Sequence, residues 1–190
     1  MPDRVYGAKG VPDNLHAGRT GLAVAGRVIA GDLPEIYLHP GQQHVAASPT
    51  LIKMILGSCA GIFLFDRLLC IGGGTHFMLP HHGSGHPSSR YGDIAIANLL
   101  EKFRTLGSSR ENLQAKVFGG GSMLSALRHM SGNQVGHIGE RNVEIAKEVL
   151  AAASIPIVAR DVLGSRGRMV AMVSSTGEVT LEFISQADGH

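Results

Sequence analysis

Two apolar segments joined by a short polar turn constrain the fold of this chain more than any other feature. Residues 60–65 (AGIFLF) are uninterruptedly apolar, and residues 69–79 form a second apolar segment that is broken by three consecutive glycines at 72–74. Short apolar runs bounded by turn residues are typical of buried strands. The sequence therefore predicts an antiparallel hairpin, turning near Arg67, inside a covered sheet.

The turn determines which residues of this hairpin face each other. A symmetric loop of Arg67 and Leu68, or the wider loop 66–69, pairs Cys59 directly with His76. Side chains opposed in this way have Cβ atoms ~4.5–5.5 Å apart, so the thiol and the imidazole can share a proton. A thiolate–imidazolium pair is the activated nucleophile of cysteine acyl-transfer enzymes. A bulge at the glycines 72–74 would instead put the two residues on opposite faces.

Gly57 and Ser58 directly precede the cysteine. A glycine two residues before a nucleophile permits a close approach, and backbone N–H groups freed there can point at a carbonyl oxygen. However, a cysteine in an apolar strand is more often a buried small hydrophobic residue. Residue types and spacing alone therefore leave both a catalytic and a packing role open for Cys59.

The remaining pattern predicts the fold class. Helical spacing of apolar residues appears from Asp93 to about Leu106 and from Gly139 to Ala153, with a shorter helical turn at 122–129. Strands are expected at residues 35–38, 43–47, 50–56, 60–65, 69–79, 115–118, 155–160, 168–174 and 178–183. This order predicts an α+β fold in which helices pack on a mostly antiparallel sheet. Residues 1–33, with a short strand at 22–29, are expected to be an N-terminal extension to a single domain over 34–190.

Composition excludes several classes of function. The 190 residues carry 17 Lys and Arg against 15 Asp and Glu, without a basic stripe, and no Trp, which argues against nucleic-acid binding. The longest apolar run, 54–65, is too short to span a bilayer, and the N-terminus lacks the apolar region of a signal peptide. Two cysteines make no disulfide framework. We therefore expect a cytoplasmic protein that neither inserts into membranes nor binds nucleic acid.

Five short motifs together resemble the CheD family of chemoreceptor glutamine deamidases. They are LGSCA at 56–60, GGTHFMLP at 73–80, RYGD at 90–93, KVFGGG at 116–121 and IGERN at 138–142. The resemblance extends over residues 35–183 in the family's order and spacing. It implies a three-layer α/β sandwich, the CheD-like deamidase fold, which is related to toxin-type glutamine deamidases.

The resemblance also implies a reaction. Cys59 would be the nucleophile and His76 the general base of a protein-glutamine glutaminase, a hydrolase of bacterial chemotaxis, with Gly57 and Ser58 supporting the nucleophile and the oxyanion. The substrates would be selected glutamines on the cytoplasmic helices of methyl-accepting chemotaxis receptors, where some members also hydrolyse glutamate methyl esters. The reaction requires no metal and no organic cofactor. A CheC-like phosphatase is a possible partner.

One position departs from the family pattern. The family's third catalytic member is a threonine, and Lys53 occupies its position here. Strand alternation predicts that Lys53 lies on the same face as Cys59, where a cation would lower the pKa of the thiol but could not accept the imidazole N–H. Another group, such as Thr50 or Thr75, would then have to orient His76, or the alignment slips locally, or activity is reduced.

Two further hypotheses therefore stand beside the deamidase. In the first, the chain is a catalytically weak chemotaxis adaptor that binds receptors or a CheC-type phosphatase. In the second, it is a cysteine hydrolase of another acyl substrate on the same fold. Deamidation of a receptor fragment distinguishes the three hypotheses.

Other polar residues have weaker links to the proposed chemistry. His81, His82 and His86 lie in a polar loop without paired ligands at metal-binding spacing, so we expect a solvated loop and no metal site. Cys70 lies in the second apolar segment, where we expect it to pack as a small hydrophobic residue.

Three of the family-like motifs carry residues whose role stays open. The glycines 119–121 lack the Lys-Ser/Thr ending of a phosphate-binding loop, and we expect them to line a substrate groove. Arg141 and Asn142 open a helix and bind either neighbouring loops or the substrate. The same two alternatives apply to Arg90 and Tyr91.

Overall fold

The apolar runs of the sequence form the strands of two stacked sheets in the computed structural model, which describes residues 4–6, 32–122 and 138–184. The strands are β1 (Arg4–Tyr6), β2 (Glu35–Tyr37), β3 (Gln43–Ala46), β4 (Leu51–Leu56), β5 (Ala60–Asp66), β6 (Ile71–Phe77), β7 (Leu113–Gly119), β8 (Ile157–Val162), β9 (Arg168–Val173) and β10 (Val179–Phe183). The helices are α1 (Gly92–Thr105), the short 3-10 helix η2 (Arg110–Asn112) and α2 (Ile138–Ala152).

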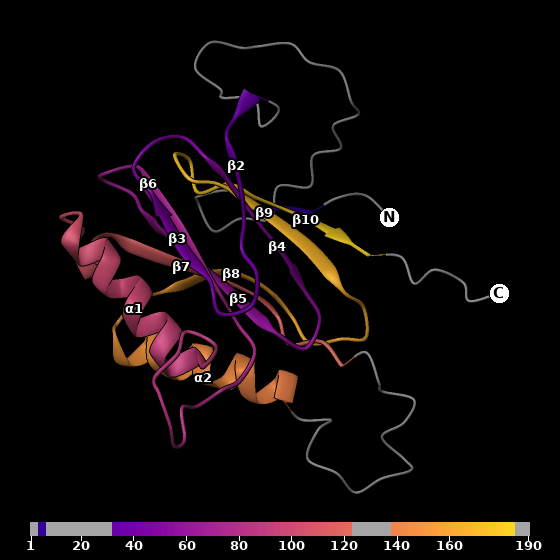
Figure 1. Ribbon diagram of the computed structural model, residues 1–190. Coiled ribbons are helices and arrows are strands. Elements are labelled where there is room, and N and C mark those ends of the chain that lie inside the picture. The colour runs from indigo at the N-terminus through magenta and orange to yellow at the C-terminus, as the bar shows by residue number, and fades with distance from the viewer. Residues whose placement is uncertain (1–3, 7–31, 123–137, 185–190) are drawn as a thin grey trace, which may run out of the picture.

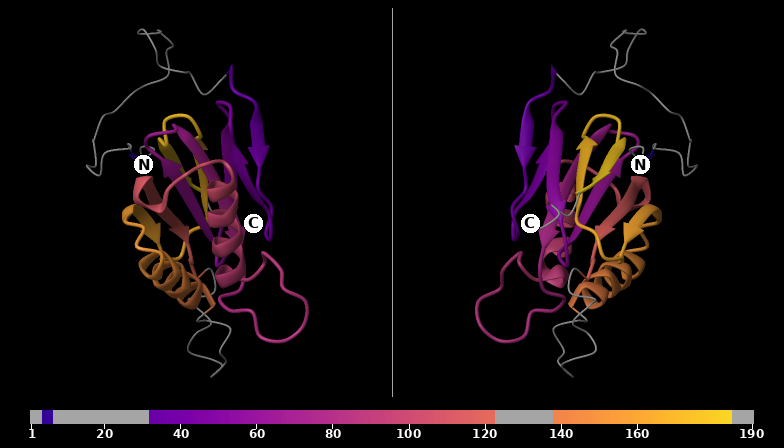
Figure 2. Two further views of the ribbon diagram at one scale, coloured as in Figure 1. Left: turned by 90° about the vertical axis from the view of Figure 1, so that its left-hand side faces the viewer. Right: turned by 90° about the vertical axis from the view of Figure 1, so that its right-hand side faces the viewer.

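The two sheets and the helices make three layers (Figure 1). The first sheet has the strand order β1-β10-β9-β4-β2, and the second has the order β3-β6-β5-β7-β8. The helices α1 and α2 cover the outer face of the second sheet, and Figure 2 shows the same layers from two further sides. Only the pairs β2–β4 and β7–β8 are parallel among the described strands. The predicted α+β, three-layer, mostly antiparallel fold is therefore confirmed, with the strands divided between two sheets.

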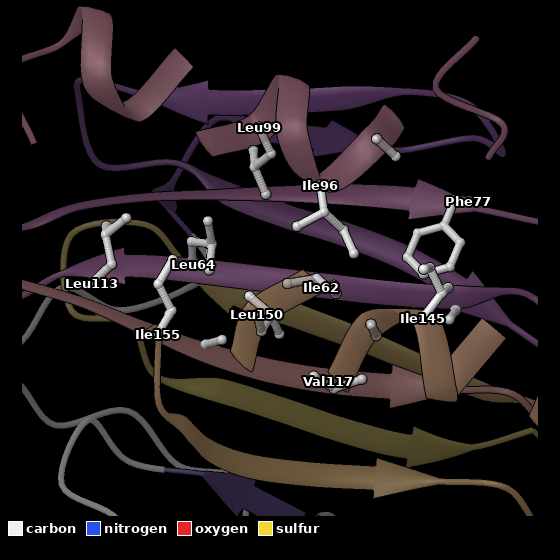
Figure 3. Close-up of a cluster of buried hydrophobic side chains, with 14 of the residues drawn as sticks. Ile62, Leu64, Phe77, Ile96, Leu99, Leu113, Val117, Ile145, Leu150 and Ile155 are labelled. Atoms are coloured by element: carbon white, nitrogen blue, oxygen red, sulfur yellow. The ribbon is translucent and has the colours of Figure 1, made fainter. Parts of the chain in front are cut away.

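Each face of β5 packs into its own hydrophobic core, which explains why this strand reads as continuously apolar. Its even-numbered residues, including Ile62 and Leu64, point toward Ile96 and Leu99 of α1 and Leu150 of α2 (Figure 3). On the opposite face, the core between the sheets is formed by Leu38, Met54, Leu56, Phe63, Phe118, Val170, Met172, Val179 and Leu181, among others. None of the described helices is long and apolar enough to cross a membrane.

The predicted helices and nearly all the predicted strands are present within one to three residues of their expected bounds. The strand β1, which pairs with β10, was not expected from the sequence. The strand predicted at 22–29 and, apart from Ser122, the helical turn at 122–129 lie outside the described residues. The division into an extension over 1–33 and a domain over 34–190 stays a prediction.

The hairpin of β5 and β6 forms as predicted, but its register differs from the expected one by two residues. Asp66 is the last residue of β5 and pairs with Ile71, so the turn spans 67–70. The Asp66 carboxylate accepts hydrogen bonds from the backbone N–H groups of Leu68 and Leu69 (2.9 and 3.0 Å), which stabilises a turn one residue further along the chain than the predicted loop 66–69. Cys70 ends the turn at φ +54° and is exposed, so its predicted packing role is wrong.

The bulge at the glycines 72–74, which would have put Cys59 and His76 on opposite faces, does not occur. All three glycines pair in continuous register with β5 on one side and β3 on the other. The strands and the opposite sheet lie so close here that a Cβ on Gly72 would approach the Ser174 carbonyl oxygen to 2.6 Å. The glycines therefore permit close packing, and the faces of β6 alternate regularly up to His76.

Candidate active site

The loop formed by Gly57, Ser58 and Cys59 crosses from β4 in the first sheet to β5 in the second. Its three consecutive carbonyl groups are all hydrogen-bonded. The backbone N–H groups of Gly121 and Gly120 donate to the oxygens of Gly57 and Cys59, each at 2.7 Å. The Ser58 oxygen accepts a hydrogen bond from the side chain of Asn142 in α2, at 3.0 Å. We call residues 57–59, which include the predicted nucleophile Cys59, the nucleophile loop.

The glycines 119–121 therefore pack against the nucleophile loop and hold its backbone through hydrogen bonds. All three are buried, so the expectation that they line an open substrate groove is wrong. Gly119 and Gly120 have φ values of +98° and +67°, and a Cβ on Gly119 would lie 2.3 Å from the Cys59 oxygen. Only glycine permits this backbone conformation together with this close approach.

The N–H groups of the nucleophile loop contrast with its carbonyl groups. Within the part of the chain that the structure describes, no other residue accepts a hydrogen bond from the N–H groups of Ser58 and Cys59, and the Cys59 N–H bonds only to its own sulfur. A pair of backbone donors next to a nucleophile is the arrangement that stabilises an oxyanion. The predicted supporting role of Gly57 and Ser58 is compatible with this geometry and stays a prediction.

His76 lies on the face of β6 that is turned toward the first sheet. It pairs with Gly61 of β5. Gly61 has no side chain, which leaves room for Met54, because a Cβ at Gly61 would lie 2.2 Å from the Met54 sulfur. Cys59 stands two residues before Gly61 and packs against the same inter-sheet core. The two residues are therefore diagonal neighbours on one face, and not directly opposed as the sequence predicted.

The segment 38–42 holds His76 through both its ring and its backbone. The imidazole Nδ1 lies 2.9 Å from the Leu38 carbonyl oxygen, which makes Nδ1 the protonated nitrogen because a carbonyl can only accept. The backbone of His76 accepts a hydrogen bond from Gly41 N–H and donates one to the Gln42 oxygen (2.7 and 3.0 Å). The ring is thereby fixed in one tautomer, with Nε2 free to accept a proton.

The group that orients the imidazole is a backbone carbonyl, which no side-chain pattern in the sequence reveals. Thr50 bonds to the Ser48 oxygen, and Thr75 lies on the opposite face of β6, so neither performs this role. The Nε2 atom of His76 is buried and has no partner among the described residues. His76 itself is 2% exposed.

The structure corrects the prediction for Lys53. Because Ile52, Met54 and Leu56 point into the inter-sheet core, Lys53 points to the outer face of the first sheet, away from Cys59. Its ammonium group forms an ion pair with Glu35 at 2.6 Å. Lys53 does contribute through its backbone, since its carbonyl oxygen accepts the N–H of Leu38 at 2.8 Å. That contact depends on the backbone and not on whether the side chain is lysine or threonine.

Burial shifts the pKa values of both groups toward their neutral forms. Desolvation raises the pKa of the Cys59 thiol, and a hydrogen bond from its own backbone N–H opposes this shift. Desolvation also lowers the pKa of His76, which the Leu38 hydrogen bond partly offsets and the nearby His39 reinforces. The free protein therefore favours a neutral thiol and a neutral imidazole over the thiolate–imidazolium pair that the sequence suggested.

The other polar residues that the sequence singled out form hydrogen bonds within the fold. His82 donates its backbone N–H to the Asp93 carboxylate, and no group of three or more metal-ligating side chains gathers in the described ranges. Of the two roles left open for Asn142, the structure shows bonds to neighbouring loops. The Arg90 backbone carbonyl accepts hydrogen bonds from the N–H groups of Met78 and Leu79, directly after β6.

Comparison with known proteins identifies the family. A family model described as CheD chemotactic sensory transduction matches residues 78–183. A probable chemoreceptor glutamine deamidase CheD 1 of Anaeromyxobacter dehalogenans is 42% identical over 138 residues, and the aligned region covers 73% of this chain and 78% of that relative. A probable chemoreceptor glutamine deamidase CheD 2 of Geobacter sulfurreducens is 38% identical over 156 residues, which cover 82% of this chain and 94% of that relative.

Among solved structures, the Bacillus licheniformis hypothetical protein YfiH aligns at 16% identity over 73% of this chain and 59% of the YfiH chain. Its TM-score of 0.43 is low. The match to the family model and the identity to these relatives over most of their length agree with the five sequence motifs. The chain belongs to the CheD family.

Proposed function

We propose that this protein is a chemoreceptor glutamine deamidase that converts glutamine side chains to glutamate through a thioester on Cys59. The observation that carries the proposal is the arrangement of one thiol and one oriented imidazole on a single face, in a chain whose relatives are named as such deamidases. The receptor glutamines lie on cytoplasmic helices, so the same proposal places the enzyme in the cytoplasm.

The first half of the reaction forms the thioester. The Cys59 sulfur attacks the carboxamide carbon while its proton moves to Nε2 of His76, which the Leu38 carbonyl has left as the accepting nitrogen. The negative charge on the former carbonyl oxygen is held by the N–H groups of Ser58 and Cys59. The tetrahedral intermediate then collapses, the C–N bond breaks, and Nε2 returns the proton to the departing nitrogen as ammonia leaves.

The second half of the reaction releases the product. Water attacks the thioester carbon and transfers a proton to Nε2, the C–S bond breaks, and the proton returns to the sulfur. The products are glutamate and free enzyme, and each atom and proton is accounted for without a metal or an organic cofactor. A neutral resting pair suits this scheme because His76 must accept the thiol proton in the first step.

The position of Lys53 supports the deamidase proposal over the weak adaptor. Its side chain lies on the outer face of the first sheet, and its backbone supports Leu38, which orients the imidazole. The departure from the family threonine therefore gives no reason to expect an inactive site. Binding to a CheC-type phosphatase is a separate expectation, which a pull-down with that partner tests.

Incubation with a receptor cytoplasmic fragment tests the proposal. Peptide mass spectrometry should show glutamine replaced by glutamate at selected positions with wild-type protein, and no replacement with Cys59→Ala or His76→Ala. Cys70→Ala, which alters the exposed cysteine in the β5–β6 turn, is the matched control and should retain activity. If wild-type protein binds the fragment but changes no glutamine, the chain is an adaptor and the proposal fails.

A further inference from the structure

Helix α2 begins beside the nucleophile loop and carries one fully buried polar side chain, Asn142, which is 0% exposed. Its Nδ2 atom donates two hydrogen bonds of 3.0 Å, to the carbonyl oxygens of Ser58 and Met78. Both partners can only accept, so the amide nitrogen must face them. These two bonds fix the position of the amide nitrogen, while the buried Oδ1 atom of the same amide has no hydrogen-bond partner among the described residues.

The two acceptors belong to the two segments that carry the proposed chemistry. Ser58 directly precedes Cys59, and Met78 follows His76 by two residues, directly after β6. Asn142 therefore joins the nucleophile loop to the strand of the base from a third element of the fold.

Peptide geometry gives the bond to Ser58 a specific consequence. In a planar trans peptide, the carbonyl group and the following N–H point in opposite directions. By holding the Ser58 oxygen, Asn142 fixes the direction of the Cys59 N–H on the other side of the same peptide plane. A hydrogen bond on the carbonyl also polarises that N–H and strengthens it as a donor. The bonds from Gly120 and Gly121 hold the adjoining peptide planes.

We propose that Asn142 is a positioning residue that presets the Cys59 N–H as an oxyanion donor. The inference rests on the proposed deamidase function and names the side chain that prepares its transition state. Asn142 acts through the Ser58–Cys59 peptide, and the charge on the oxygen develops only as the C–S bond forms. Loss of Asn142 therefore lowers kcat and leaves KM for the receptor fragment nearly unchanged.

Kinetics of Asn142→Ala on the receptor fragment test this inference. We expect kcat to fall about 10–100-fold, less than the loss on removing an oxyanion donor outright, with KM within about threefold of wild type. Leu150→Ala, buried on the same helix in the helix-facing core, is the matched control. It should lower the melting temperature and leave kcat unchanged at a temperature where both variants are folded. An unchanged kcat in Asn142→Ala, or an equal loss in both variants, overturns the inference.

A spectroscopic readout separates the inference from the proposed function. The chain has only two cysteines, so 15N-cysteine labelling gives two backbone amide signals, which Cys70→Ala assigns. Asn142→Ala should shift the Cys59 signal and leave the Cys70 signal in place, and Leu150→Ala should shift neither. If Asn142→Ala does not fold, Asn142→Ser, which leaves a smaller cavity, replaces it.

The two failures are distinguishable. A Cys59 signal that stays in place in the Asn142 variant overturns the positioning role, whatever happens to activity. Wild-type protein that deamidates no glutamine refutes the proposed function and with it the oxyanion role, while a shifted Cys59 signal would still show that Asn142 sets this peptide.

Discussion

The support of the nucleophile loop by Gly119 leads to a prediction that can be worked out from the structure. A Cβ at Gly119 would lie 2.3 Å from the Cys59 carbonyl oxygen and 3.2 Å from the Cα of Ala60, and the residue has a φ of +98°. The carbonyl is backbone and cannot swing aside as a flexible side chain would. Gly119→Ala must therefore displace the nucleophile loop or the end of β7.

Three costs add up in this variant. An alanine in the left-handed region costs about 1–2 kcal/mol, overpacking about 1–3 kcal/mol, and loss of the hydrogen bond from Gly120 to the Cys59 oxygen about 1 kcal/mol. The free energy of unfolding should fall by about 3–6 kcal/mol, a large part of the ~5–15 kcal/mol of an ordinary domain. A shift of Cys59 by a fraction of an ångström to one ångström should also lower deamidation by about 10–100-fold.

Gly107→Ala is the matched control, because Gly107 has a φ of +88° but nothing within 4 Å of the added Cβ. Gly107→Ala should lower the free energy of unfolding only by the cost of an alanine in the left-handed region, about 1–2 kcal/mol, and should leave activity unchanged. Urea unfolding gives the two free energies, and deamidation of the receptor fragment below the unfolding transition gives the two rates. Equal destabilisation of both variants, with full activity in Gly119→Ala, would refute the reasoning.

Three further predictions concern charged and titrating groups. Lys53→Ala should lose only the ~0.2–1 kcal/mol of a partly exposed ion pair with Glu35 and keep its activity, and a tenfold drop in deamidation would show that the side chain does reach the site. The rate of Cys59 alkylation by iodoacetamide in Cys70→Ala should rise with pH, and the midpoint of that rise should lie above the pKa of ~8.5 of an ordinary thiol. A midpoint near or below neutral pH would reveal a preformed thiolate. Burial lowers the pKa of Lys116 from 10.5 to about 8, so the unfolded chain binds more protons between these values and stability should rise with pH across that window. Urea unfolding at about pH 7 and about pH 10 should show this rise in wild type relative to Lys116→Met, and parallel behaviour of the two proteins would count against it.

The sequence predicted the fold class and the central hairpin because both follow from local patterns. Apolar runs, helical spacing and turn residues marked the elements, and two helices with mostly antiparallel strands followed from their order. The register of the hairpin was missed because Asp66 is the last residue of β5 and its carboxylate stabilises a turn over 67–70, one residue further along the chain than the predicted loop 66–69. A displacement by two residues keeps the same faces, so Cys59 and His76 still share one.

Other features of the site depend on contacts between distant segments. The orientation of His76 by Leu38 uses a backbone carbonyl from the connection between β2 and β3, and any residue type supplies such a group. Alternation along β4 could not place Lys53 relative to Cys59, because the chain leaves the first sheet at Gly57 before it reaches the cysteine. For Asn142 the sequence left two roles open, and only the folded arrangement brings its amide to Ser58.

Partial chemical modification tests the central claim, that Cys59 is the nucleophile, most directly. Wild-type protein is treated with iodoacetamide for increasing times, and each sample is divided between peptide mass spectrometry and deamidation of the receptor fragment. Residual activity should fall in proportion to the fraction of Cys59 modified, and it should be independent of the fraction of Cys70 modified. Deamidation that persists when Cys59 is fully alkylated would contradict the account.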